Sequence, residues 1–146
     1  MNIFESLRKD HDIQRQLLEV LVQTEGDSKT RDRAFKALKH ELEIHANGEE
    51  RHFYSPLIDI DKTQPHARHG VAEHHEIDEI VETLEKTDYD SSAWLKYAKN
   101  LKEKVEHHLE DEEHTFFQLA GKVLSESQKT TLADNYNAYM SDCRKK

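Results

Sequence analysis

Apolar residues along this chain recur at alternating steps of three and four, the spacing that places them on one face of an α-helix. Most charged residues lie off this apolar face, as is typical of the solvated face of such a helix. No window shows the alternation of period two that marks a half-buried strand. The pattern predicts an all-α protein with five helical stretches, at about residues 3–23, 29–54, 64–85, 93–122 and 126–142.

The breaks between these stretches predict how the helices are connected. A short turn at Gly26 and another at residues 88–92 make the flanking helices antiparallel neighbours. Pro56 is expected to end the second helix at Tyr54, because proline disrupts a helix interior. The run Ser125–Gln128 has the form of a capping box and opens the last stretch. The expected fold is an antiparallel up-down-up-down four-helix bundle with a short C-terminal fifth helix, forming one domain over residues 1–146.

Polar residues occupy some positions where the helical pattern calls for core residues. In a helix, residues four apart stand one turn apart on the same face. Counting residues from the turns places these side chains at one level of the bundle. The six residues are His11, His45, Glu49, His74, His108 and Glu112.

The chain also repeats itself without a gap at an offset of 63 residues. Each half carries a histidine, a second histidine 34 residues later, and a glutamate four residues further on. This regularity indicates a duplicated helical hairpin with half of a site in each copy. The related pairs are His11 with His74, His45 with His108, and Glu49 with Glu112.

A metal centre explains why such residues would be buried together. An unpaired buried carboxylate costs several kcal/mol, and two divalent cations bound by imidazoles and bridged by glutamates would remove that cost. Imidazole and carboxylate ligands suit iron, zinc or manganese, and a bridged pair open to small ligands suits iron best. The alternative that stays open is a layer of ion pairs without metal.

Other titratable residues are expected to have smaller roles. His52 could lie behind a ligand, and His75 and His107 are expected to face solvent. Asp78, four residues after His74, is a possible further ligand, although its partner in the repeat is Arg15, which cannot bind a metal. The remaining histidines are expected at the surface or in loops: His40, His66, His69 and His114.

Charge and composition narrow the possible partners. The formal net charge of −9 argues against nucleic acid, whose phosphates require a basic face. The apolar runs are too short to span a membrane, and the N-terminus lacks the pattern of a signal peptide. The single cysteine, Cys143, is expected to be a free thiol, which fits a reducing cytoplasm.

Over roughly residues 5–120, the motifs resemble those of the hemerythrin-like, or HHE cation-binding, family. The resemblance implies a four-helix bundle with a non-haem di-iron centre, its two irons joined by an oxo or hydroxo bridge. By matching positions, His11 and His45 would bind one iron, His74 and His108 the other, and both glutamates would bridge. The motifs are Lys9-Asp10-His11, His45-x-x-x-Glu49-Glu50-x-x-Phe53-Tyr54, Glu73-His74 and His108-x-x-x-Glu112-Glu113-x-x-Phe116-Phe117.

Two positions depart from the pattern of that family. Respiratory hemerythrins carry a fifth histidine one turn after the third-helix ligand, where this chain has Asp78. Four histidines would leave open positions on both irons, which counts against simple oxygen carriage. Gly48 within the second-helix motif is also unexpected, because glycine costs about 1 kcal/mol relative to alanine inside a helix.

The expected function is binding or processing of dioxygen, peroxide or nitric oxide for sensing, detoxification or oxygen handling. Four aromatic residues near the motifs are expected to wall a small apolar pocket: Phe53, Tyr54, Phe116 and Phe117. Two alternatives stay open. One is an iron storage or sensing module without turnover, and the other is a zinc or manganese site with a structural or hydrolytic role. Whether the protein is an enzyme, and which protein or redox partner it has, is left open by the sequence.

Overall fold

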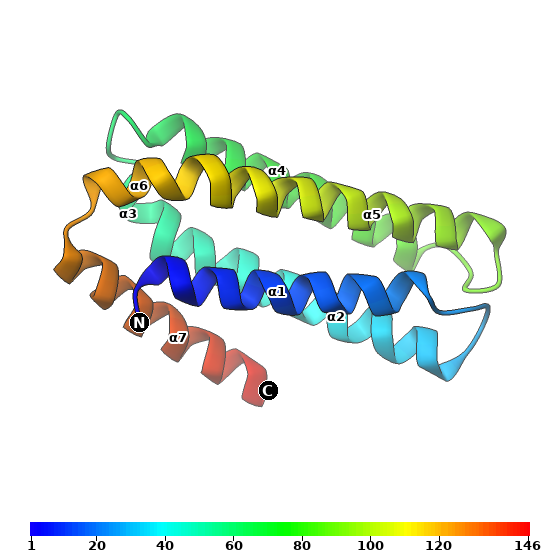
Figure 1. Ribbon diagram of the computed structural model, residues 1–146. Coiled ribbons are helices and arrows are strands. Elements are labelled where there is room, and N and C mark those ends of the chain that lie inside the picture. The colour runs from blue at the N-terminus through cyan, green and yellow to red at the C-terminus, as the bar shows by residue number, and fades with distance from the viewer.

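The computed structural model describes all 146 residues and contains helices, turns and short connections but no strands. Four long helices form an antiparallel bundle, and a fifth, α7, lies across one side of it (Figure 1). This architecture confirms the predicted all-α bundle with an additional C-terminal helix. The four bundle helices are α1 (Ile3–Val22), α2 (Lys29–Glu49), α4 (Gln64–Glu85) and α5 (Ser92–Asp111).

Local capping explains where the first and last helices begin. The Asn2 side chain accepts a hydrogen bond from the Glu5 backbone while the Glu5 side chain accepts one from Asn2, which forms a capping box. The predicted capping box of Ser125 and Gln128 opens α7 (Glu126–Lys145) in the same way. This fifth helix has 20 residues, as many as α1, and is therefore longer than expected.

Two wide, π-helical turns interrupt the second and fourth long helices. The turn η1 (Glu50–Tyr54) joins α2 to α3 (Ser55–Leu57), and η2 (Glu112–Phe116) joins α5 to α6 (Phe117–Val123). In each turn a backbone N–H bonds to the carbonyl five residues earlier. The predicted glutamate ligands lie at these turns: η1 directly follows Glu49, and η2 begins at Glu112.

The expectation that the second helix ends at Tyr54 is wrong, because the helical course continues through Pro56 to Leu57. The wide turn that precedes Pro56 changes the hydrogen-bond register, so proline occupies the first turn of α3. In a first turn the missing N–H of proline has no helical partner to lose.

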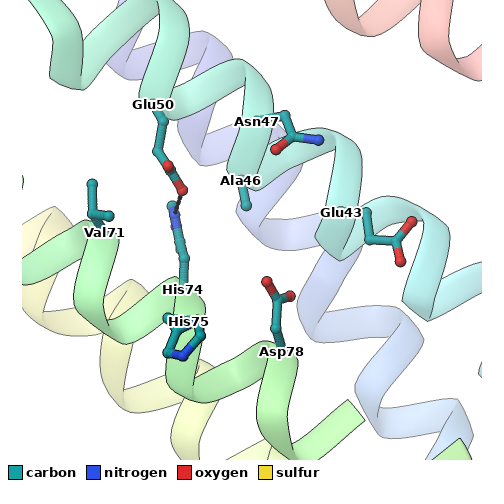
Figure 2. Close-up of a pocket in the computed structure, with 8 residues that line it drawn as sticks. All are labelled: Glu43, Ala46, Asn47, Glu50, Val71, His74, His75 and Asp78. Carbon is teal, nitrogen blue, oxygen red and sulfur yellow. Dashed lines mark hydrogen bonds and ion pairs between the residues drawn. The ribbon is translucent and has the colours of Figure 1, made fainter. Parts of the chain in front are cut away.

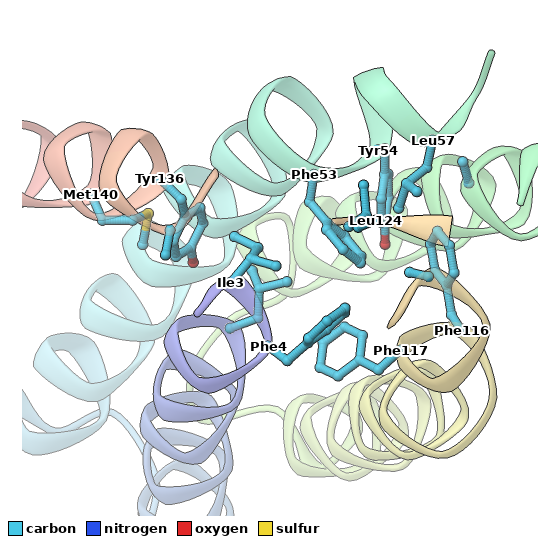
Figure 3. Close-up of a cluster of buried hydrophobic side chains, with 14 of the residues drawn as sticks. Ile3, Phe4, Phe53, Tyr54, Leu57, Phe116, Phe117, Leu124, Tyr136 and Met140 are labelled. Atoms are coloured by element: carbon cyan, nitrogen blue, oxygen red, sulfur yellow. The ribbon is translucent and has the colours of Figure 1, made fainter. Parts of the chain in front are cut away.

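A polar layer divides the bundle interior into two apolar clusters. One cluster lies toward the two interhelical turns and includes Trp94 and Leu101. The other surrounds the wide turns and includes Phe4, Phe53 and Phe117, as Figure 3 shows. Along α1 and α4 the histidine ligand lies between residues of the two clusters, and along α2 and α5 it lies next to the point where the cluster changes. None of the helices combines the length and the apolar composition that crossing a membrane requires.

Helix α7 packs against α1 and α2, and Gly48 allows it to approach closely. A Cβ atom at Gly48 would lie 3.0 Å from the Tyr139 ring and 3.1 Å from the Tyr136 ring. This contact gives a packing reason for the glycine that looked unexpected within the second-helix motif.

Candidate metal centre

The six predicted ligands lie together in the polar layer, and each of them is at most 6% exposed. Each bundle helix contributes one histidine to this layer. Glu49 ends α2, and Glu112 begins the wide turn η2 that follows α5. The structure thus brings together every residue of the set that helical phase and the repeat indicated.

The histidine rings direct their Nε2 atoms toward the two carboxylates. His74 Nε2 lies 3.1 Å from an oxygen of Glu49, and His11 Nε2 lies 3.3 Å from an oxygen of Glu112. His45 Nε2 is 3.5 Å from Glu49, and His108 Nε2 is 3.8 Å from Glu112. The ligand atoms fall into two overlapping groups, which are His11, His45, Glu49 and Glu112, and then Glu49, His74 and His108.

Most of these inward-facing atoms have no hydrogen-bond partner. All four Nε2 atoms, both oxygens of Glu49 and one oxygen of Glu112 are buried and unpaired. An unsatisfied buried polar group costs about 1–3 kcal/mol, and more if it is charged. A layer of ion pairs without metal would leave His45 Nε2 and His108 Nε2 at 3.5 and 3.8 Å from their carboxylates, too far for good hydrogen bonds. Cations between the rings and the carboxylates would satisfy all of these atoms. The residues present therefore fit a pair of cations.

The outward-facing nitrogens of His11 and His74 each contact a carboxylate that belongs to the other half of the repeat. His11 Nδ1 lies 2.7 Å from Glu113, and His74 Nδ1 lies 2.7 Å from Glu50. Glu50 and Glu113 are themselves 63 residues apart. Because a carboxylate accepts, each Nδ1 carries a proton, and Nε2 is the nitrogen that would bind a cation after losing any second proton.

The other two histidines are held differently. His108 Nδ1 donates directly to Glu73 at 2.6 Å. His45 Nδ1 donates at 2.7 Å to the hydroxyl of Tyr136 on α7, which in turn donates to Asp10 at 2.6 Å. Asp10 and Glu73 are partners in the repeat. Aspartate is one methylene shorter than glutamate, and the tyrosine fills the remaining distance.

Sequence reasoning did not assign a role to these partners of the histidines. The signal was present for the carboxylates, since each one is adjacent in sequence to a ligand in both halves of the repeat: Asp10, Glu50, Glu73 and Glu113. Tyr136 gave no such signal, because α7 lies outside the repeat.

A tyrosine also contacts the Glu112 carboxylate. The Tyr54 hydroxyl donates a hydrogen bond to Glu112 Oε2. The other oxygen, Oε1, is the one that has no partner. Gly70 on α4 lies against this hydroxyl, and a Cβ atom there would collide with it. Tyr54 packs with Phe53 and Phe116, with ring centroids 5.6–5.9 Å apart. The four aromatic residues expected to wall a pocket instead fill the apolar cluster beside the centre.

A small enclosed cavity lies on the opposite side of the polar layer, and three of its lining residues are His45, His74 and His108. Gln14 lines it from α1, and the Gln14 amide nitrogen is buried without a partner. Asp78 completes the polar part of the lining, and Leu42 and Ile77 belong to the apolar part. The cavity has room for about one water-sized molecule, and it offers such a molecule both an apolar wall and an available N–H donor.

Asp78 also lines a wider pocket at the surface between α2 and α4, shown in Figure 2. Glu43, Glu50 and His75 line the same pocket, and three residues line both this pocket and the inner cavity: Ala46, His74 and Asp78. Asp78 belongs to neither group of metal-binding residues. In the other half its repeat partner, Arg15, bonds to Glu113 at 3.0 Å.

His52 and His75 lie away from the centre. The ring of His52 contacts Tyr139 on α7, with centroids 5.6 Å apart, so the expectation that it lies behind a ligand is wrong. The wide turn η1 explains this, because it shifts the helical phase after Glu49. His75 is exposed and pairs with Glu79, as expected for a solvent-facing residue.

Charges in the polar layer shift several pKa values. Burial and the nearby charge of Glu49 raise the pKa of Glu112 to about 7. Burial opposes protonation of His74, but contacts with Glu49 and Glu50 outweigh it and raise the pKa of His74 to about 10. The hydrogen bond from His108 lowers the pKa of Glu73 to about 2. In this layer the carboxylates hold protons on neighbouring groups, and bound cations would replace those protons.

Four helices that enclose two overlapping sets of buried histidines and glutamates define a cation-binding bundle protein. The family model of the hemerythrin HHE cation-binding domain matches residues 2–120, and the chain therefore belongs to that family. No curated protein matches the chain.

A solved structure shares the fold of the whole chain. It is the crystal structure of a hemerythrin HHE cation-binding domain-containing protein from Mycobacterium kansasii, with a TM-score of 0.87 and 22% sequence identity. The alignment covers 99% of this chain and 88% of that one, so it extends beyond the matched family domain to include α7.

Proposed function

We propose that the centre holds two iron ions and that the protein binds or processes a small oxidant, with dioxygen or peroxide favoured over nitric oxide. The observation that carries this proposal is the enclosed cavity, which is lined by three histidine ligands and by the unpartnered Gln14 amide. An N–H donor in a buried cavity favours a ligand whose oxygen atoms accept hydrogen bonds.

The arrangement of the side chains indicates how they would share the two ions. His11 and His45 would hold one ion, His74 and His108 the other, and Glu49 belongs to both groups. Glu112 lies between His11 and His108 and would form the second bridge. When bound, such an iron pair supplies open coordination positions and electrons for chemistry with small oxidants.

The chain's own residues prepare the cavity for such a ligand. Gln14 would donate its amide N–H to the ligand, and Leu42 and Ile77 exclude bulk water. Asp78 lines the same cavity, and burial raises the pKa of its carboxyl group. The wider surface pocket on the other side of Asp78 offers a route for small molecules.

A second candidate function is metal sensing without turnover. It is favoured by the hydrogen bond from His45 to Tyr136, which joins one ligand directly to α7. Loading or loss of metal would then alter how α7 is held against the bundle. A zinc or manganese centre would be compatible with the same ligands, and metal analysis distinguishes it.

The proposal is tested with freshly purified protein by metal analysis and optical spectroscopy. We expect about two irons per chain, as the two ligand groups require, and an absorption change on adding peroxide or dioxygen. Gln14→Leu is expected to retain both irons. Its oxidant-bound spectrum should be weaker or should decay faster than that of the unchanged protein. Two irons with no spectral response to dioxygen, peroxide or nitric oxide would contradict the proposal and favour the sensing role.

A further inference from the structure

A second group of metal-binding side chains lies outside the centre, on the surface formed by α4 and η2 with the end of α5. It comprises His69, Glu73 and Asp111, whose ligand atoms all lie within 4.8 Å of one another. His69 and Asp111 are exposed, whereas Glu73 is only 4% exposed. His66, one turn before His69, lines the same narrow pocket. We call His69, Glu73 and Asp111 the outer cluster.

We propose that the outer cluster binds one divalent transition-metal cation and delivers cations to the buried centre. One imidazole and two carboxylates are ligands that ferrous iron, zinc and manganese share. The exposed position leaves room for water molecules to complete the coordination of an arriving ion. Binding at this surface does not depend on what the buried centre does with an oxidant.

The pocket at the outer cluster leads toward the buried centre. His69 and Asp111 line its outer part, and the buried ligands His108 and Glu112 line its inner part. The pocket is narrow, so a passing cation would have to displace side chains rather than diffuse through open space. The His69 side chain is 61% exposed, so solvent leaves room for it to be displaced.

Glu73 connects the outer cluster directly to the centre. Its Oε1 atom accepts the hydrogen bond from His108 Nδ1 at 2.6 Å and lies 3.4 Å from His69 Nε2. A cation bound at Glu73 would therefore compete with His108 for the same carboxylate. Lys104 lies 3.7 Å from the second oxygen of Glu73 and pairs more closely with Glu76, so an arriving cation would also displace this weaker contact.

The internal repeat shows that the outer cluster is not a by-product of the duplicated scaffold. The positions in the first half that correspond to His69, Glu73 and Asp111 are Ser6, Asp10 and Gly48. Only Asp10 among them carries a strong metal ligand, and Arg144 and Tyr136 of α7 already bind it. The second half thus carries two further ligands, on a surface that α7 does not cover.

The test counts cations in the full-length protein after the buried centre has been filled. Equilibrium dialysis against zinc is expected to show one additional cation per chain beyond those of the centre. His69→Ala and Asp111→Ala should each lose this additional cation and keep the inner ones. The matched control is His75→Ala, which removes an exposed histidine paired with a glutamate at 3.2 Å on the same helix, and it should keep the additional cation.

A second measurement tests delivery. Metal-free protein is mixed with ferrous iron, and filling of the centre is followed by its absorption. Both cluster variants should load more slowly, by about tenfold, which is within the range expected when a charged cleft concentrates an ion.

Two results would overturn the proposal. If both cluster variants keep the additional cation, or if His75→Ala loses it as fully as they do, the outer cluster is not the binding site. Unchanged loading rates in both cluster variants would remove the delivery role. Neither result depends on the reaction with an oxidant, so failure here is distinguishable from failure of the proposed function.

Discussion

The two halves of the bundle hold their second histidine ligand from the outside in different ways. In the second half, Glu73 accepts directly from His108 and its surroundings are open to solvent. In the first half, Asp10 reaches His45 only through Tyr136, and α7 covers the surface. The inner ligands obey the repeat, as do Glu50 and Glu113, whereas the groups that support the second histidine of each half have diverged. The repeat therefore preserves the metal layer more strictly than the surfaces around it.

The largest effect is expected at the glutamates, whose roles are only partly symmetric. Glu49 belongs to both groups of ligands, whereas Glu112 belongs to one. Glu49→Ala should therefore lose both ions, and Glu112→Ala should keep one ion at His74 and His108. Metal analysis after dialysis measures the difference. Equal stoichiometry in the two variants would show that the glutamates are equivalent and would contradict the grouping.

A large effect on stability is expected on the side that α7 covers. Gly48→Leu would force a side chain into Tyr136 and Tyr139, and overpacking of this kind costs about 3 kcal/mol at the upper end of its usual range. The free energy of unfolding in urea measures this loss. The matched control is the repeat partner on the open side, Asp111→Leu, which should change the free energy by only about 0.5 kcal/mol. Similar losses in both variants would mean that α7 does not restrict this position.

A smaller effect is expected from the groups that orient His45 and His108. Tyr136→Phe removes the acceptor for His45 and the donor to Asp10, and comparable changes lower metal affinity about 10–100-fold. Glu73→Gln retains a carbonyl oxygen that can accept from His108, so its effect on affinity should be weaker. Competition with a chelator of known affinity measures both variants. A stronger loss in Glu73→Gln would show that charge, rather than hydrogen bonding, supports the ligand.

The smallest effect is expected in the pH dependence of metal binding. Contacts with carboxylates outweigh burial and raise the pKa values of the repeat-related pair His11 and His74, the latter to about 10. His74 is therefore protonated in the metal-free protein at neutral pH, and a metal must displace this proton. Affinity should rise with pH through the neutral range, because the proton competitor becomes scarcer up to the raised pKa.

Calorimetry in buffers of different ionisation enthalpy measures the proton count directly. More than one proton should be released per chain at pH 7, because His74 is protonated and Glu112, whose pKa is about 7, is partly protonated. Release of none would show that both rings are neutral before the metal arrives. Replacement of Glu50 by Gln should lower the pKa of His74 and reduce the release, because Glu50 is one of its carboxylate contacts.

The sequence was sufficient to predict the four-helix bundle and the meeting of the six inner residues. Helical phase places one side chain relative to its own helix, and the gapless repeat then places the second half relative to the first. Helical phase is local information, and the repeat copies that information from the first half of the chain to the second. They therefore required no knowledge of how distant surfaces pack.

Other features depended on contacts that periodicity does not encode. The wide turn η1 changed the helical phase, and it moved His52 away from the centre and carried the helix past Pro56. Tyr136 reaches His45 from a helix outside the repeat, 91 residues away along the chain. Gly48 had a low helix propensity that seemed a defect until its contact with α7 was known. In each case tertiary packing overrode a local preference.

The exchanged carboxylates Glu50 and Glu113 have a consequence for assembly. Each half supplies the glutamate that orients the first histidine of the other half, so neither hairpin alone can complete its own half of the layer. Two identical hairpins related by a twofold axis would make the same exchange, because a symmetric interface pairs residue i with j and j with i. A homodimer of one such hairpin would therefore meet the same geometric requirement, and the covalent link between the halves here lets one side differ from the other by carrying α7.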